Sequence, residues 1–310
     1  MSVEEELGKL SPRKEMLLTI GVFDGVHLGH KHLISKLKEL ARKQGYSSGV
    51  ITFSQHPREV LSPKTKLPSL TSLEQRIALL KDAGVDVVIP LSFTPQLAGL
   101  SPAQFTNLLK ENLKMKGLVI GPDFALGKNR QGDGNTLRRL GREMGFSVTV
   151  VLPMTIDSQV VSSTAIRKTL AEGDMKRAQK LLGRPFRLQG RVVAGDKRGV
   201  ELGFPTANLE VEPGQALPAG GVYACRAYTD GQTYSAMTNI GHRPTFGGGE
   251  QLIEVYLLDY NGNLYGHELA IDIIERLRDE KKFDTPEQLK EQMAEDVKQG
   301  KALLKTRGEK

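Results

Sequence analysis

The sequence predicts an α/β domain with a parallel sheet, followed by a small antiparallel β-barrel domain and a C-terminal helix. Three observations lead to this prediction. The 310 residues correspond to about two domains of ordinary size. The first half alternates short apolar runs with helical patterns, as parallel strands joined by crossover helices do. From residue 186 onward, strand-like segments separated by turn signals replace that alternation.

The α/β alternation can be followed element by element through the first half. Apolar runs predict strands at residues 16–23, 49–53, 85–91, 117–121 and 147–152, and helical patterns predict helices at 30–43, 71–82, from 101 onward and at 136–144. A capping box at residues 71–74 marks the start of one of these helices. After Thr164 we expect two short helices, one closed by Gly173 and one ending near Gly183.

The second half reads mainly as strands. Alternating or apolar segments predict them at residues 187–194, 222–228, 233–240, 252–258 and 268–275. Turn signals at 247–249 and 261–263 separate several of these segments, which favours a small barrel or sandwich over further α/β structure. The boundary is expected near Gly183-Arg184-Pro185, which gives domains at 1–183 and 184–310.

A capped helix is expected near the C-terminal end of the sequence. Thr285 is a suitable N-cap, Pro286 suits the first turn and Gln288 completes a capping box. Apolar residues then recur every fourth position from Leu289 to Val297. This spacing places them on one helix face, which we expect to dock on the barrel.

Composition excludes several classes of protein. A hydrophobic share of 39% and a charged share of 25% are those of an ordinary globular chain, and not of a disordered or fibrous one. No apolar run reaches the roughly 18 to 20 residues that a membrane span needs, and the acidic start does not resemble a signal peptide. The single cysteine, Cys225, is expected to pack in a strand. We therefore expect a soluble, cytoplasmic protein with no membrane partner.

The net charge of +7 favours an anionic partner, either nucleic acid or phosphorylated small molecules. The chain has no tryptophan, and aromatic residues make up 5% of it. Such a composition offers little material for stacking single-stranded bases. Phosphorylated small molecules are therefore the favoured partners.

The densest chemical signal lies at the end of the first predicted strand. Residues 21–30 read Gly-Val-Phe-Asp-Gly-Val-His-Leu-Gly-His. Free backbone N–H groups and the helix dipole at such a strand-to-helix turn favour a phosphate. His27 and His30 can donate hydrogen bonds to a triphosphate and stabilise the charge that develops when an oxygen attacks phosphorus.

This run resembles the nucleotide-binding motif of the nucleotidyltransferase superfamily that transfers AMP from ATP, and its longer form is similar to the FAD synthetase branch. Two further segments agree with the resemblance. Residues 121–127, Gly-Pro-Asp-Phe-Ala-Leu-Gly, resemble a family loop in which an aromatic residue usually stands at the position of Leu126. Residues 161–167, Val-Ser-Ser-Thr-Ala-Ile-Arg, are similar to the second superfamily signature, whose hydroxyls, helix-start amides and arginine suit a phosphate clamp.

The resemblance implies a Rossmann-like nucleotidyltransferase fold and assigns roles residue by residue. His27 and His30 would be catalytic, and Asp123 and Phe124 would bind the flavin. The residues implied to bind nucleotide in this domain are Gly21, Phe23, Asp24, Gly25, His27, Gly29, His30, Ser162, Ser163, Thr164 and Arg167.

A second motif opens the predicted barrel. Residues 190–208 are rich in glycine, which can cradle phosphates but also collects in ordinary hairpins. The segment ends in Pro-Thr-Ala-Asn. In an extended chain Thr206 and Asn208 point the same way and offer a hydroxyl and an amide oxygen to one hard cation. Magnesium with ATP phosphates is the obvious candidate.

This ending resembles the Pro-Thr-Ala-Asn signature of riboflavin kinases. The resemblance continues through residues 221–223, 239–246 and 253–259. It implies that Glu254 is the catalytic base and that Arg243 binds the flavin, whereas the alternation of Glu254 with its apolar neighbours by itself indicates only an outward-facing strand residue. The resemblance further implies that Thr206 and Asn208 bind the metal ion. The residues implied to bind nucleotide in this domain are Gly195, Arg198, Gly199 and Gly203.

Together the resemblances cover roughly residues 14 to 305, and the chain is identified as a member of the prokaryotic bifunctional riboflavin kinase/FAD synthetase family. Membership implies phosphorylation of riboflavin by MgATP to FMN, and then transfer of AMP from a second ATP to FMN, giving FAD and pyrophosphate. The expected cofactor is Mg²⁺, and the expected partners are ATP, riboflavin, FMN and FAD. We expect no nucleic-acid partner, and a monomer or weak homo-oligomer.

Three alternatives stay open at this point. The nearest is a riboflavin kinase whose adenylyltransferase half is inactive, suggested by Leu126. The second is a non-catalytic flavin carrier, which would have no reason to keep Glu254 and the Thr206 and Asn208 pair. The third is a nucleic-acid-binding protein, which would explain the positive charge.

Overall fold

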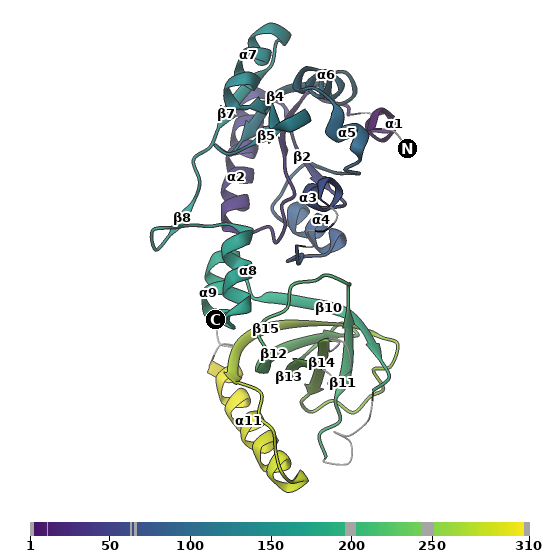
Figure 1. Ribbon diagram of the computed structural model, residues 1–310, viewed down its shortest axis with the longest axis vertical. Coiled ribbons are helices and arrows are strands. Elements are labelled where there is room, and N and C mark those ends of the chain that lie inside the picture. The colour runs from purple at the N-terminus through teal and green to yellow at the C-terminus, as the bar shows by residue number, and fades with distance from the viewer. Residues whose placement is uncertain are drawn as a thin grey trace. The chain divides into compact units, whose positions relative to one another are not determined.

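The computed structural model describes residues 3–10, 12–62, 64, 67–195, 203–242 and 251–306 (Figure 1). The chain divides into two compact units, Met1–Ser163 and Thr164–Lys310. Helices α8 (Ser163–Ala171) and α9 (Met175–Leu182), both predicted, belong mainly to the second unit, where α9 packs on two strands of the barrel. The assignment of the two activities to residues 1–183 and 184–310 stays a prediction.

The first unit is an α/β layer structure, as predicted. Its principal elements are α1 (Val3–Gly8), β1 (Met16–Ile20), α2 (Leu28–Gln44), β2 (Ser47–Phe53), α3 (Pro57–Leu61), α4 (Leu73–Asp82), β3 (Val87–Leu91), α5 (Pro95–Gly99), α6 (Pro102–Leu113), β4 (Met115–Ile120), α7 (Gly134–Met144) and β7 (Ser147–Val150). Four two-residue strands, β5 (Ala125–Leu126), β6 (Gly132–Asp133), β8 (Thr155–Ile156) and β9 (Gln159–Val160), form two hairpins.

The main sheet of this unit is parallel, with strand order β3-β2-β1-β4-β7. The order reverses between β1 and β4, because the chain builds outward from β1 on one side and from β4 on the other. In open parallel sheets, ligands bind beyond the carboxyl ends of the strands at such a reversal. The two motifs that follow β1 and β4 therefore emerge at this position.

Helices cover both faces of the sheet (Figure 1). Leu18 of β1 packs in a cluster with Phe105 and Leu109 of α6, whereas its neighbour Leu17 packs in a second cluster with Ile34 of α2. Successive strand side chains point to opposite faces. The strands are consequently buried on both sides, which explains why they read as apolar runs rather than as alternating patterns.

The start of α4 corrects one detail of the sequence prediction. The capping box was expected at residues 71–74, but Ser72 is the N-cap and its partner is Gln75. The Thr71 hydroxyl is instead engaged by the first motif, because it accepts a hydrogen bond from the Gly25 amide. Thr71, which the local pattern predicted as the N-cap, therefore makes a long-range hydrogen bond instead of capping the helix.

Two glycines of α7 should respond oppositely to replacement by alanine. A Cβ on Gly141 would lie 2.5 Å from the Phe146 carbonyl oxygen, whereas a Cβ on Gly134 would meet only Val150, at 3.8 Å. Although alanine is the better helix former, we expect Gly141→Ala to lower the free energy of unfolding by about 1–3 kcal/mol. The matched Gly134→Ala variant should be neutral or stabilised by up to about 1 kcal/mol. Urea denaturation of both variants would test this, and equal stabilities would contradict it.

The second unit contains the predicted antiparallel barrel. Its strands are β10 (Phe186–Val193), β11 (Ala207–Val211), β12 (Gly221–Thr229), β13 (Gln232–His242), β14 (Gln251–Leu257) and β15 (Glu268–Arg278). They close in the order β10-β11-β14-β13-β12-β15. Strand β11 was not predicted, because it begins within the polar Pro-Thr-Ala-Asn run, at Ala207. The predicted turn at 247–249 lies outside the described residues, and the turn at 261–263 lies between β14 and β15.

The predicted C-terminal helix is present as α11 (Pro286–Thr306), and it packs against strands β12, β13 and β15. Val297 and Leu303 contact an apolar cluster on the outside of the barrel. Thr285 accepts a hydrogen bond from the Gln288 amide, as predicted for an N-cap. The Gln288 side chain, however, accepts from the Asp284 amide, one residue before the expected partner.

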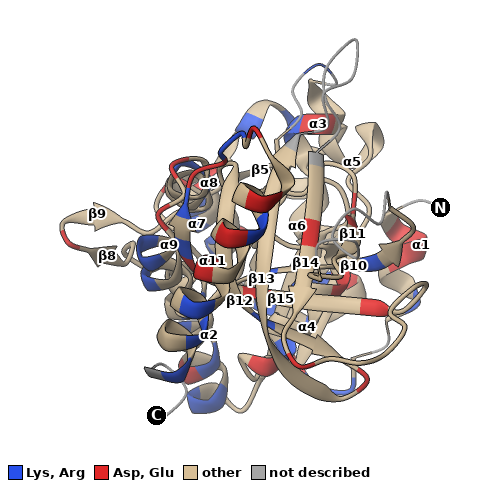
Figure 2. Cartoon of the chain, turned by 90° about the horizontal axis from the view of Figure 1, so that it is seen from below, with Lys and Arg blue, Asp and Glu red and all other residues tan. Residues whose placement is uncertain are grey.

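Much of the positive charge lies on solvated helix faces. Figure 2 shows Lys and Arg along α2, α7 and α9. Several of these side chains pair with carboxylates one turn away, as Lys43 does with Glu39 and Arg139 with Glu143. Exposed pairs of this kind contribute little stability.

Two further observations concern expectations from composition. Cys225 is buried in β12, and burial raises the pKa of its thiol to about 12, so it packs as a small apolar side chain. Among the described residues, no helix has both the length and the apolar character that crossing a bilayer requires.

Candidate functional site

The first motif forms a strained turn between β1 and α2. Phe23 and Val26 adopt positive φ angles of 54° and 37°, and Gly25 has a φ of 82°. A positive φ is costly for a β-branched residue such as valine. Backbone strain of this kind persists where the surrounding contacts enforce it, and it is concentrated at ligand sites.

The two motif histidines lie against each other at the start of α2. Their rings stack with centroids 3.6 Å apart and an interplanar angle of 16°. His27 is the N-cap of the helix, and its Nδ1 accepts a hydrogen bond from the His30 amide at 3.3 Å. A neutral His27 therefore carries its proton on Nε2, where it can serve as a donor.

His30 is held in its neutral form. Burial, the neighbouring His27 and the charge of Arg76 keep the pKa of His30 well below its usual value of about 6.5. Its Nδ1 atom is buried and has no hydrogen-bond partner among the described residues. A buried polar atom without a partner is costly, so this side chain is suited to meeting a ligand.

Asp24 is buried within the same turn, and its carboxylate anchors the backbone. It accepts hydrogen bonds from the amides of Leu70 and Thr71 at 2.9 to 3.1 Å. These contacts fasten the turn to the start of α4. Through them Asp24 supports the site by shaping the turn, and a direct contact between Asp24 and nucleotide stays a prediction.

The structure brings the first motif and the Ser-Ser-Thr motif together. Ser163 Oγ donates to the Asp24 carbonyl oxygen at 2.9 Å. A Cβ on Gly29 would lie 2.9 Å from the Val161 carbonyl oxygen and 3.2 Å from the His27 ring. Only glycine allows α2 to approach the Ser-Ser-Thr motif this closely.

Replacement of Gly29 by alanine should separate the two motifs. We expect Gly29→Ala to lower FAD synthesis from FMN by about 10²-fold, because small displacements of positioning groups have effects of that size. Riboflavin phosphorylation by the same preparation should be unchanged. Gly99→Ala is the control, since a Cβ there meets no atom within 4 Å. Normal FAD synthesis by Gly29→Ala would contradict the role of this close contact.

The remaining predicted residues of the first unit are placed as follows. Gly21 directly follows β1, and a Cβ on this residue would lie 3.2 Å from the Phe23 ring. Asp123 is exposed just after β4, and its carbonyl oxygen accepts from Arg130. Phe124 is half-buried and packs on the core that contains Leu126. Leu126 thus fills a core position in place of an aromatic ring.

The rest of the Ser-Ser-Thr motif lies at the start of α8. Ser162 precedes this helix and is half-buried, as is Arg167 within it. Thr164 is exposed in the first turn. Their predicted contacts with a triphosphate stay predictions.

Sequence reasoning missed three buried residues that support the turn: Thr52 at the end of β2, Thr71, and Arg76 of α4. Thr52 donates to the Val22 carbonyl oxygen at 2.8 Å. Arg76 and Leu80 are the buried residues of α4, four positions apart. A charged residue in the apolar phase of a helix was therefore the signal that could have identified Arg76.

The barrel places a second set of polar side chains in one row. Glu254 of β14 lies opposite Asn208 of β11 on one side and opposite Asn239 of β13 on the other. Asn239 Nδ2 donates to Glu254 Oε2 at 3.5 Å. Their apolar neighbour Val255 is buried, whereas Glu254 is half-buried. The row therefore lies on the outer face of the barrel, where a substrate can reach the carboxylate.

Asn208 is suited to holding a hard cation. Its Oδ1 is buried and accepts no hydrogen bond from any described residue. Gly195 lies directly against the amide group, because a Cβ there would be 1.4 Å from Nδ2. Thr206 is half-buried two residues before Asn208. An amide oxygen and a hydroxyl are the ligand types that Mg²⁺ prefers, so the donors present fit that ion.

The other predicted residues of the barrel divide into two groups. Gly203 adopts a φ of 86° just before Phe204, a conformation that glycine adopts without strain. Arg198, Gly199 and Arg243 lie outside the described residues, and their roles stay predictions.

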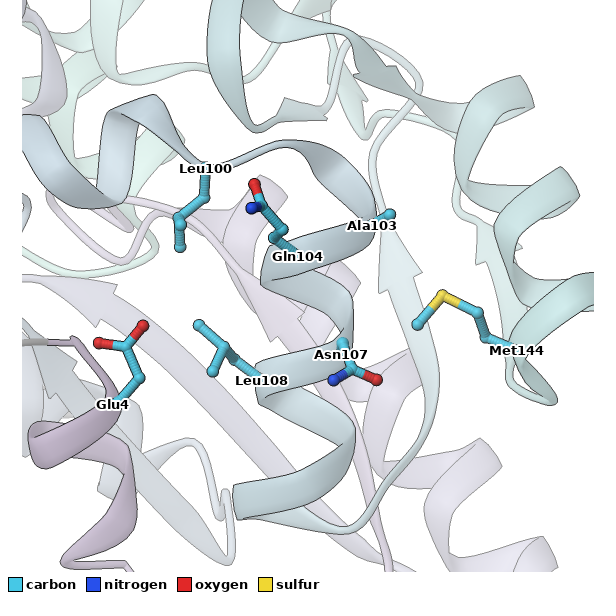
Figure 3. Close-up of a pocket in the computed structure, with 7 residues that line it drawn as sticks. All are labelled: Glu4, Leu100, Ala103, Gln104, Asn107, Leu108 and Met144. Atoms are coloured by element: carbon cyan, nitrogen blue, oxygen red, sulfur yellow. The ribbon is translucent and has the colours of Figure 1, made fainter.

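A pocket of about 480 Å³ lies elsewhere in the first unit, beside α6 (Figure 3). Glu4 of α1, Asn107 and Leu108 of α6, and Met144 of α7 contribute to its lining. None of the predicted site residues that the structure describes lines it.

Comparison with known proteins finds a known family for each half of the chain. Residues 10–165 match the FAD synthetase family, and residues 182–304 match the riboflavin kinase family. A bifunctional riboflavin kinase/FMN adenylyltransferase from Pseudomonas fluorescens is 39% identical over 306 residues, which cover 98% of each chain. The chain belongs to the bifunctional riboflavin kinase/FMN adenylyltransferase family. The predicted identification is thus confirmed.

Other members of this bifunctional family are similarly related. The enzyme of Escherichia coli (strain K12) is 38% identical and that of Bacillus subtilis (strain 168) 37%, with coverage of 92% and 90% of each chain. A crystal structure described as a macrolide-efflux protein from Streptococcus pneumoniae superposes with a TM-score of 0.87 at 31% identity, covering 94% of this chain and 95% of that one. The order of an α/β unit followed by a barrel is therefore found in a solved structure.

Proposed function

We propose that this chain makes FAD from riboflavin in two steps, at two separate sites. Residues 184–310 phosphorylate riboflavin with MgATP, giving FMN and ADP. Residues 1–183 then join FMN to the AMP part of a second ATP, giving FAD and pyrophosphate. The observation that carries this proposal is the presence of two groups of polar side chains, the His27 and His30 pair and the Asn208–Glu254–Asn239 row, on two different folds.

The geometry of the histidine pair suits adenylyl transfer. A phosphate oxygen of FMN attacks the α-phosphorus of ATP, and the bond between the α-phosphorus and its bridging oxygen breaks to release pyrophosphate. His27 and the neutral His30 donate hydrogen bonds to the phosphate oxygens, where negative charge develops. Ser162, Ser163, Thr164 and Arg167 would hold the triphosphate, and Asp123 and Phe124 would contact the flavin.

The geometry of the barrel row suits phosphorylation of an alcohol. Glu254 accepts the proton of the riboflavin 5′-hydroxyl while that oxygen forms a bond to the γ-phosphorus, and the bond to ADP breaks. Thr206 and Asn208 would hold Mg²⁺, which when bound neutralises charge on the ATP phosphates. Gly195, Arg198, Gly199 and Gly203 would line the nucleotide, and Arg243 the flavin.

Several features favour the two-step function over the alternatives. The histidine pair, the glycine that allows the approach to Val161 and the Ser163 contact are all present, which favours an active adenylyltransferase half. A flavin carrier would not need a base beside a cation site. Small phosphorylated substrates also account for the positive charge, and a requirement for ATP agrees with a cytoplasmic enzyme.

A chromatographic time course tests the function directly. Purified protein is incubated with riboflavin, excess ATP and magnesium, and a second reaction begins from FMN. We expect riboflavin to pass through FMN to FAD, and FMN to be converted directly in the second reaction. If FMN accumulates in the first reaction and stays unconverted in the second, the protein is a kinase with an inactive adenylyltransferase half. If neither product forms, the proposal is wrong.

A further inference from the structure

A buried arginine outside the recognised motifs lies behind the histidine pair. Arg76 of α4 is 5% exposed. Its Nη1 donates to the Phe53 carbonyl oxygen at 2.8 Å and to Thr52 Oγ1 at 3.5 Å, and its Nη2 donates to the Thr71 carbonyl oxygen at 3.5 Å. The guanidinium therefore connects the end of β2 to the segment that precedes α4.

Two of these partners, Thr52 and Thr71, also form hydrogen bonds to the turn that carries the histidines. Thr52 Oγ1 donates to the Val22 carbonyl oxygen at 2.8 Å. Thr71 accepts from the Gly25 amide at 3.1 Å through its hydroxyl, and its own amide donates to the Asp24 carboxylate at 3.1 Å. The turn from Val22 to Gly25 is thus held on both sides by residues that Arg76 binds. A buried network of this kind specifies one arrangement of its members.

Arg76 also acts on the site through its charge. It is a fixed cation, since a guanidinium keeps its proton throughout the physiological pH range. Its charge is one of the influences that lower the pKa of His30, after burial and His27. The other charged group in the turn is the Asp24 carboxylate, which is bound to backbone amides. A buried cation near the neutral imidazole of His30 makes the site favourable for an anion such as a triphosphate.

We propose that Arg76 is a positioning residue for adenylyl transfer, which both fixes the turn carrying His27 and His30 and adds a permanent positive charge to the triphosphate site. The inference rests on the proposed function of the first unit. It assigns to a residue of α4 a part of the ATP affinity that the motifs alone do not supply.

The test separates the fixed geometry from the charge. Arg76→Met removes both, whereas Arg76→Lys keeps the charge and loses the planar fork of donors. FAD synthesis from FMN is measured for both variants as a function of ATP concentration and pH. We expect Arg76→Met to lower kcat/KM by about 10²-fold and to raise KM for ATP by about tenfold. Arg76→Lys should keep KM for ATP within about threefold of the unmodified protein while kcat falls about tenfold.

The pH dependence provides a readout that a purely structural role would not alter. Without the nearby cation the pKa of His30 rises, so the acidic limb of the FAD synthesis profile should move to higher pH in Arg76→Met but not in Arg76→Lys. Nuclear magnetic resonance of the imidazole in both variants would record the same shift without requiring activity. Lys81→Met, which removes an exposed cation from the same helix, should change neither quantity.

Riboflavin phosphorylation, proposed for the other unit, controls for the amount of intact protein, and a thermal melt reports whether the first unit is folded. Unchanged KM for ATP and an unchanged pH profile in Arg76→Met would overturn the inference. So would a loss of thermal stability with no change in the kinetics of the folded fraction. If Arg76→Met does not fold, the imidazole titration and the KM for ATP of Arg76→Lys decide the question. A KM for ATP that rises in Arg76→Lys by as large a factor as kcat falls would overturn the charge role. Absence of FAD synthesis in the unmodified protein would remove the proposed function instead.

Discussion

Replacement of both His27 and His30 by alanine is expected to abolish FAD formation from FMN, with a loss of at least about 10³-fold in kcat. Loss of one donor to a developing oxyanion typically costs about 10²-fold to 10³-fold, and the two imidazoles here are stacked 3.6 Å apart as one unit. Chromatography of reactions supplied with FMN, ATP and magnesium would measure the loss. FMN formation from riboflavin should continue at the rate of the unmodified protein.

The control for this experiment lies on the same helix. His32 is exposed in the first turns of α2, and His32→Ala should leave both activities unchanged. Because Nδ1 of His27 caps the helix, the double variant should also lose about 1 kcal/mol of stability, which a thermal melt would detect. Normal FAD synthesis by the double variant would remove the histidines from the mechanism. Loss of FMN formation as well would show that the two activities are not separable.

Replacement of Glu254 by alanine is expected to abolish FMN formation while FAD formation from supplied FMN persists. A positioned general base contributes about 10²-fold to 10⁴-fold, so kcat for riboflavin phosphorylation should fall by at least about 10²-fold. Glu254→Gln should be equally inactive, since an amide keeps the shape of the carboxylate but cannot accept the proton. The rates of FMN and FAD formation would be measured separately, with riboflavin or FMN as the starting material.

Glu210 provides the matched control for Glu254. It is an exposed glutamate on the neighbouring strand β11, and Glu210→Ala should leave both activities unchanged. A Glu254→Gln variant that phosphorylates riboflavin at the normal rate would exclude this carboxylate as the base. The expected reciprocal result, with one activity lost in each of the two variants, would assign each reaction to its own unit.

Local patterns determined much of this protein in advance. The five sheet strands and the helices α2, α4, α6 and α7 of the first unit, the helix cap at Thr285 and the inward face of α11 follow from residues close together in the sequence, because periodicity and capping are short-range effects. The short helices α1, α3 and α5 were not predicted. The motif that follows β1 and the motif at residues 190–208 could likewise be recognised from the sequence, since each is a continuous run of residues. These runs carried the identification of the family.

Tertiary structure alone decided how those runs are supported. The Thr71 hydroxyl, which the local pattern predicted as a helix cap, instead accepts a hydrogen bond from the amide of Gly25, 46 residues earlier. Asn239 contacts Glu254 because the register of β13 and β14 places the two residues opposite each other. Arg76 is connected to the motif turn through its hydrogen bonds to Thr52 and Thr71. Such contacts depend on strand order and register, which are settled when distant segments bury their apolar faces together, and no local pattern encodes them.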